Sequence, residues 1–155
     1  MPKLENFTKK RYRELLELET EGLLESSTKY ELKSYDDIFK AQIIWEMRDQ
    51  YLSLLESFCS NEISPVELWL DLGTLTTSAS QMLQIARARD FILSPDVRCK
   101  AFASHIAEMT IECQDYVTNL QDEVIKKEDI PAYKLEFKNH MTNQINIAKA
   151  LILDI

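Results

Sequence analysis

The chain has 155 residues, of which 45% are hydrophobic, and a formal net charge of −8 at pH 7. This length suits one domain with its own core. Two glycines and four prolines leave too few turn residues for a fold built on β-hairpins. The composition therefore predicts an all-α protein. Its negative field repels nucleic acid and anionic membranes and favours a basic partner, although an acidic surface can also serve solubility alone.

Residues 3–25 are predicted to form the first helix, which is basic at its start and acidic at its end. This charge order opposes the helix dipole, so the helix needs packing to be stable. The run Ser26-Ser27-Thr28 is interpreted as a linker behind it. We therefore expect an N-terminal helix and linker over residues 1–33 and a helical bundle over residues 34–155.

The second helix is predicted from Ser34, as its N-cap, to Cys59. Its apolar residues recur three and four apart on one face: Ile43, Ile44, Met47, Tyr51, Leu54, Leu55 and Phe58. A second apolar stripe, Trp45, Leu52 and Cys59, has a spacing of seven and would lie about 120° round the helix. Two interpretations stay open for this stripe: it packs on a terminal helix, or it is an exposed docking surface centred on Trp45.

An elbow follows, in which Ser60-Asn61 interrupts the apolar pattern and Ser64-Pro65-Val66-Glu67 restarts it. The restart combines a capping hydroxyl, a proline at the first helical position and a glutamate three residues after the cap. The third helix should run from Pro65 to about residue 89. Gly73 and the hydroxyl residues around it predict either a bend or a division into two helices.

Two further helices are predicted to start at the same kind of proline signal, Ser94-Pro95-Asp96 and Asp129-Ile130-Pro131. The helix behind the first has the longest apolar repeat in the chain and should extend to about Lys127. The last helix places apolar residues on one face up to Ile152. Together these patterns predict an antiparallel helical bundle, with a four-helix core over residues 35–153 and an additional N-terminal helix.

The chain offers no pattern for catalysis, for a metal or for a cofactor. Cys59, Cys99 and Cys113 fit neither a zinc spacing nor a disulfide framework, and they are predicted to be reduced core residues. His105 and His140 occur in single pairs with nearby glutamates, which we interpret as surface pairs. No apolar stretch of about 20 residues and no secretory signal are present. We therefore expect a protein that is not an enzyme, in a reducing compartment such as the cytoplasm.

The elbow segment, residues 51–69, reads YLSLLESFCSNEISPVELW. It resembles the start of the bacterial self-protective colicin-like immunity proteins, the family of the colicin D inhibitor. In that family a helix ending in leucine or phenylalanine is followed by a short polar turn and by an aromatic residue on the next helix. Extended over the following helices, the resemblance covers residues 45–127. It implies a small four-helix bundle that imitates tRNA and blocks the active site of a basic ribonuclease.

These observations predict a non-catalytic, acidic, protein-binding module, in its sharper form an immunity-like inhibitor of a basic nuclease. The carboxylates expected to contact the partner lie around the helix ends: Glu62, Glu67, Asp71, Asp90 and Asp96. The alternative is an assembly subunit of a larger complex that docks through Trp45 and Leu52, with Cys59 and residues 151–153 as further apolar contacts. Neither reading includes direct contact with nucleic acid or a membrane, and a homodimer stays open.

Overall fold

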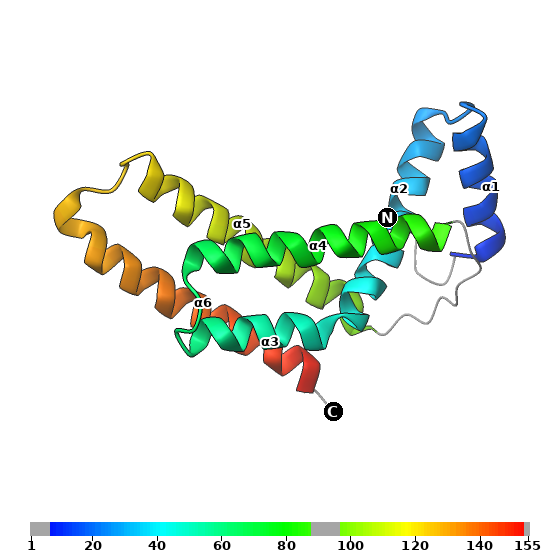
Figure 1. Cartoon of the computed structure of the whole chain (residues 1–155). Helices are drawn as coiled ribbons and strands as arrows, with labels where there is room; N and C mark the ends of the chain where they lie inside the picture. Colours follow the sequence, from blue (N-terminus) through cyan, green and yellow to red (C-terminus); the bar gives the residue numbers. More distant parts are fainter. Residues whose placement is uncertain (1–6, 88–96, 154–155) are drawn as a thin grey trace.

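The computed structural model describes residues 7–87 and 97–153 (Figure 1). The prediction of an all-α fold is confirmed, because these residues form six α-helices and one short 3-10 helix and contain no strand. The elements are α1 (Lys9–Thr20), α2 (Ser26–Glu46), α3 (Arg48–Cys59), α4 (Pro65–Arg87), α5 (Arg98–Gln121), η2 (Lys127–Asp129) and α6 (Ile130–Leu153).

Four of the helices close a ring. Helix α3 contacts α4 and α6, and α5 contacts the same two helices from the other side. Helix α2 packs on α4 and α5, whereas α1 packs on α2. Figure 1 shows the consequence: α1 and α2 form a hairpin that stands out from one end of the bundle, at the end opposite the α3–α4 elbow.

The N-terminal elements differ from the prediction. Residues 26–28, expected to be a linker, are the first turn of α2, where the Glu25 N–H donates to Thr28 Oγ1 (2.8 Å). The turn lies earlier, at Gly22, which adopts a φ of +71°. Ser34, expected to be an N-cap, is buried within α2, and its hydroxyl donates to the Tyr30 carbonyl (3.1 Å). Serine and threonine are favoured at N-caps, but their hydroxyls can also donate to the carbonyl four residues earlier within a helix, as Ser34 does, so a single serine does not decide between the two cases.

The predicted helix from 34 to 59 is two helices, because α2 ends at Glu46 and α3 begins at Arg48. Residues 41–45 just before the break are all buried, since α4 and α5 both cover this part of α2. No glycine or proline marks the break. The change of direction at Met47 follows from packing, and it places Trp45 and Leu52 on different helices.

The remaining predictions concern the later helices. Helix α4 is continuous through Gly73, and α6 begins at Ile130, as the third proline signal predicted. Helix α5 ends at Gln121, six residues before the predicted end, and Glu123 beyond it adopts a φ of 55°. The start signal at residues 94–96 lies outside the described residues.

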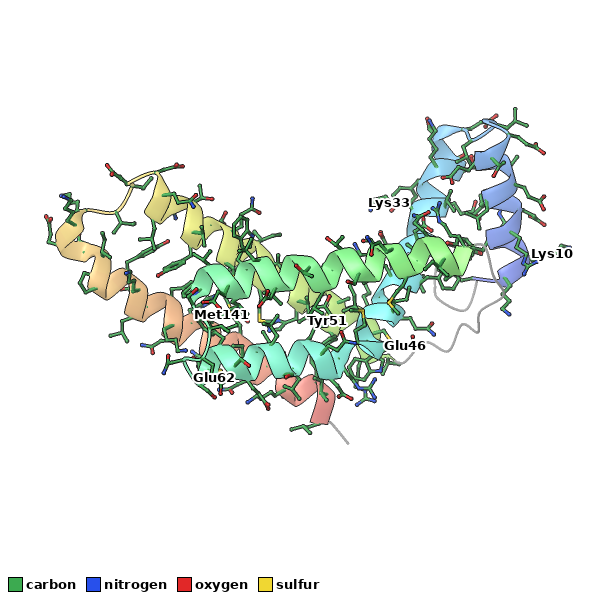
Figure 2. All side chains as sticks on the ribbon, viewed as in Figure 1. Lys10, Lys33, Glu46, Tyr51, Glu62 and Met141 are labelled. Atoms are coloured by element: carbon green, nitrogen blue, oxygen red, sulfur yellow. The ribbon has the colours of Figure 1, made fainter. Side chains whose placement is uncertain are left out.

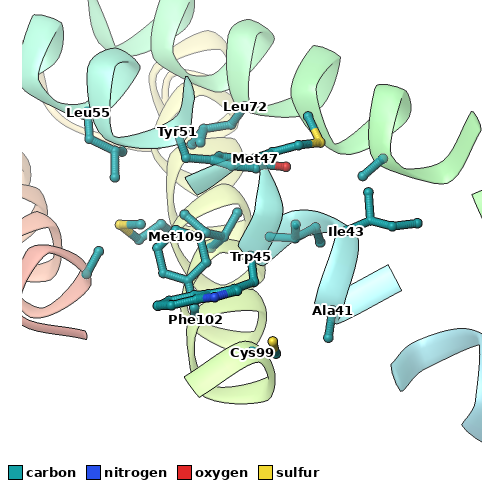
Figure 3. Packing of buried hydrophobic residues seen from close by; sticks show 14 of the residues in the cluster. Ala41, Ile43, Trp45, Met47, Tyr51, Leu55, Leu72, Cys99, Phe102 and Met109 are labelled. Atoms are coloured by element: carbon teal, nitrogen blue, oxygen red, sulfur yellow. The ribbon is translucent and has the colours of Figure 1, made fainter. Parts of the chain in front are cut away.

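The core contains the predicted apolar faces of α5 and α6. Its centre is Phe102, which is fully buried between Trp45 and Tyr51 (Figure 3). The ring of Phe102 meets Trp45 edge-on at a centroid distance of 5.5 Å and Tyr51 at 6.2 Å. Both contacts are T-shaped, the geometry that the charge distribution of aromatic rings favours. This cluster ties the end of α2, the start of α3 and the start of α5 together.

Candidate protein-binding site

The elbow between α3 and α4 begins with a glycine-like turn at Asn61. This residue has a φ of 60°, a left-handed conformation that asparagine tolerates better than other side chains. Its N–H donates to the Phe58 carbonyl (3.1 Å), and the Glu62 N–H donates to the Ser57 carbonyl (2.9 Å). These two bonds form a Schellman motif, which satisfies the last carbonyls of α3.

The start of α4 has the capping box that the sequence predicted. The Glu67 N–H donates to Ser64 Oγ (3.2 Å), and the Ser64 N–H donates to the Glu67 carboxylate (3.4 Å). Pro65 occupies the first helical position, where no N–H is needed. Local hydrogen bonds therefore fix both sides of the elbow: they position the backbone of Glu62 and hold the Glu67 side chain at the start of α4.

A groove of about 560 Å³ lies beside this elbow. Its walls come from the elbow itself, from the end of α5 and from the start of α6: Phe58, Asn61–Glu67, Tyr116, Leu120, Lys134, Phe137 and Lys138. Aromatic rings form its floor, where Tyr116 stacks on Phe137 at a centroid distance of 3.9 Å. Burial and the neighbouring Tyr133 hydroxyl raise the pKa of Tyr116, so this phenol stays neutral at ordinary pH.

Three of the five predicted carboxylates gather here. Glu62 and Glu67 line the groove, and Asp71 follows one turn further along α4. All three side chains are exposed, and none forms an ion pair with a described residue. Figure 2 shows Glu62 at the elbow end of the molecule, far from Lys10 and Lys33 on the hairpin. Asp90 and Asp96 lie outside the described residues.

Two lysines of α6 line the opposite wall of the groove, and the sequence analysis missed them. The Lys138 ammonium lies 4.0 Å from the centroid of the Phe58 ring and donates to the Phe58 carbonyl. Lys134 is exposed one turn earlier. In the sequence this pair reads as an ordinary solvated helix face, and only the packing of α6 against α3 brings it to the elbow. The site is therefore acidic on its α4 side and basic on its α6 side.

The two apolar residues predicted to contact a partner are not in this site. Trp45 is only 7% exposed, which corrects the interpretation of an exposed docking surface centred on it. The Arg48 and Arg98 guanidinium groups lie 4.7 Å and 4.5 Å from the centroid of its ring. Leu52 is half-buried on α3. The Trp45 indole therefore packs in the core, where α2, α3 and α5 meet.

The histidines are hydrogen-bonded between α5 and α6, and not with the nearby glutamates of their own helices that the sequence suggested as partners. His105 Nε2 lies 2.7 Å from the Gln144 carbonyl, and His140 Nε2 lies 2.7 Å from the Glu112 carboxylate. Within residues 7–87 and 97–153, no group of three or more potential ligands is placed to hold a metal ion. The described part of the chain also includes no helix with the length and apolar character needed to cross a lipid bilayer.

The three cysteines are free thiols that differ in exposure. Burial and the neighbouring Glu112 carboxylate raise the pKa of Cys113 to about 12, and Cys59 is half-buried. Because the thiolate is the reactive form, a disulfide reagent at pH 8 should modify Cys59 of the folded protein well before Cys113. Peptide mass spectrometry would locate the label, and unfolded protein, in which all three should react, is the control. Equal labelling of Cys59 and Cys113 in the folded state would contradict this assignment.

Comparisons of the chain with protein-family models, with curated proteins and with solved structures found no match. The protein is therefore defined by its fold and its site: an all-α helical bundle with an exposed, rigid elbow. The resemblance of residues 51–69 to colicin-type immunity proteins stays a prediction.

Proposed function

We propose that this protein is a non-catalytic binding module and that its elbow receives a basic surface of another protein. The observation that carries the proposal is the set of exposed carboxylates of Glu62, Glu67 and Asp71 at a hydrogen-bonded elbow, none of which forms an ion pair with a described residue. Asp36, by contrast, is half-buried and paired with Arg87 within the fold. Unpaired charges on a fixed scaffold bind an oppositely charged surface with little loss of entropy.

In its sharper form, the proposal is that the partner is a basic, RNA-cleaving nuclease that the elbow inhibits. The resemblance to immunity proteins and the negative charge of the chain support this form. The floor of Tyr116 and Phe137 gives an inserted side chain an apolar contact, and Lys134 would favour an acidic group at the edge of the partner.

The test compares two double variants with the same change of charge. Glu62→Gln/Asp71→Asn removes two elbow carboxylates and spares Glu67, which also caps α4. Glu17→Gln/Glu21→Gln removes two exposed carboxylates of the hairpin and is the control. Tagged wild-type protein would capture partners from native extract, followed by low-salt and high-salt washes. A basic protein released by salt should bind the elbow variant at least about tenfold more weakly, since a charged hydrogen bond contributes about 1.5–3 kcal/mol, and should bind the control normally.

The nuclease form is tested on the same captured protein. The salt-released fraction should cleave tRNA, wild-type protein should suppress the cleavage, and the elbow variant should suppress it at least about tenfold less well. Equal inhibition by both double variants would contradict a role of the elbow. Partners that stay bound in the high-salt wash and bind both double variants as tightly as the wild type would instead favour the alternative, an assembly subunit that docks through apolar surface.

A further inference from the structure

A side chain of the protein itself places a cation in the elbow groove. The Lys138 ammonium lies 4.0 Å from the centroid of the Phe58 ring and donates to the Phe58 carbonyl. That carbonyl also accepts the Asn61 N–H (3.1 Å), so both of its lone pairs are used. We call this place the cation seat: it consists of the ring face of Phe58 that Lys138 covers and of the Phe58 carbonyl.

Three features of the cation seat favour a positive charge. The Phe58 carbonyl belongs to the last turn of α3, where the negative end of the helix dipole lies. The face of an aromatic ring attracts an ammonium or guanidinium group. Glu62 and Glu67 line the same groove, and neither forms an ion pair with a described residue. An anionic group would be repelled by all three features.

Lys138 uses the surroundings of the seat incompletely. It forms no ion pair with a described residue, so the carboxylates that line the groove do not match its charge directly. A guanidinium group is planar and has five N–H donors, so it can stack on an aromatic ring and donate to carboxylates at the same time. The groove of about 560 Å³ falls within the size range of sites that hold small ligands, and it has room for one such side chain.

We propose that the cation seat receives an arginine side chain of the partner and that Lys138 fills the seat in the free protein as an internal competitor. This inference rests on the proposed function, because it names the residue with which the basic partner enters the elbow. Two like charges do not share the seat, so the Lys138 ammonium must leave when arginine binds. Its flexible four-carbon stem allows this without a movement of α6.

Competition with Lys138 sets the size of the expected effect. The apparent dissociation constant of a ligand is its intrinsic constant divided by the fraction of molecules whose seat is open. A cation–π contact with a carbonyl hydrogen bond should favour the filled seat by about tenfold, which corresponds to about 1.4 kcal/mol. Removal of the Lys138 ammonium should therefore tighten arginine binding about tenfold. A lysine of the partner would exchange one ammonium for another, so the seat should prefer arginine.

The experiment titrates the isotope-labelled full chain with N-acetyl-arginine amide and follows the backbone amide signals by NMR. The amides of the elbow, residues 58–67, and of the facing part of α6, residues 134–138, should shift saturably, with a dissociation constant in the millimolar range. N-acetyl-citrulline amide has nearly the same shape but no charge, and it should leave these signals unchanged. N-acetyl-lysine amide should bind more weakly than the arginine probe.

Three substitutions on α6 separate competition from a structural role. Lys138→Ala opens the seat and should tighten binding of the arginine probe about tenfold. Lys138→Arg fills the seat with a guanidinium group and should weaken binding below that of the wild type. Lys149→Ala is the matched control: Lys149 also reaches α3, where its Nζ lies 3.7 Å from the Glu56 carboxylate, but it does not line the groove. It removes the same charge and should bind like the wild type.

Circular dichroism should show all three variants folded, and if Lys138→Ala does not fold, the weakening by Lys138→Arg decides. Unshifted groove amides, equal binding of the citrulline probe, or Lys138 variants that bind like the wild type would overturn the proposal. The outcome is distinct from that of the proposed function. A captured partner that needs the Glu62 and Asp71 carboxylates, found together with a probe that does not bind, would reject the cation seat alone. A probe that binds, without any basic partner captured, would reject the proposed function alone.

Discussion

Replacing Phe102 with alanine is expected to lower the free energy of unfolding by about 3–5 kcal/mol, the usual cost of truncating a buried aromatic side chain. Phe102 is fully buried, and it joins Trp45 at the end of α2 to Tyr51 at the start of α3. Its removal would leave a cavity where three helices meet. Small domains are stable by only about 5–15 kcal/mol, so the loss would be a large part of the total. Urea denaturation followed by circular dichroism measures it.

Tryptophan fluorescence tests the same variant by measuring the exposure of the Trp45 indole. The edge contact of Phe102 shields the Trp45 indole, so Phe102→Ala should shift the emission toward longer wavelength. Ile111→Ala on the same helix is the control, because Ile111 is 59% exposed. It should change stability by less than about 0.5 kcal/mol. If Phe102→Ala were equally mild, the break at Met47 would need another explanation than packing around this ring.

Replacing Arg87 with methionine is expected to cost about 2 kcal/mol and to loosen the hairpin specifically. Arg87 at the end of α4 donates from Nε to the Asp36 carboxylate (3.2 Å), and its Nη2 also pairs with that carboxylate. Asp36 accepts a third bond from the Tyr12 hydroxyl (2.7 Å). Burial alone would lower the pKa of Arg87, but Asp36 and Tyr12 raise it, so the guanidinium stays charged. Charged hydrogen bonds of this kind contribute about 1.5–3 kcal/mol each.

Hydrogen exchange can show which helices lose stability in the variant Arg87→Met. Within the described fold α1 packs mainly on α2, and Arg87 also reaches Glu19 of α1 (3.1 Å). The amides of α1 should therefore lose protection while those of α5 keep it. Lys33→Met is the control, since the Lys33–Asp37 pair is exposed and contributes about 0.5 kcal/mol or less. Uniform loss of protection over α1 and α5 would mean that the hairpin is not a separate unit of local opening.

The candidate site shows how far local signals reach. The capping residues Ser64 and Glu67 predicted the start of α4 correctly because cap chemistry acts within four residues. The sequence did not predict the aromatic floor or the lysines of the groove, because Tyr116 and Lys138 come from helices distant in the sequence. The sequence left open whether Trp45 is buried or exposed, and its stripe failed for a related reason: a spacing of seven is in line only on an unbroken helix.

The sequence by itself determined the helical class, the start of α4, the start of α6 and the buried faces of α5 and α6. Those features follow from apolar periodicity, capping side chains and proline, all of which act over a few residues. The tertiary structure alone decided where α2 begins and ends, that α4 continues through Gly73, and which surfaces surround the elbow. Residues 41–45 are buried together because two other helices cover them, and such contacts between distant segments leave no local pattern from which they could be predicted.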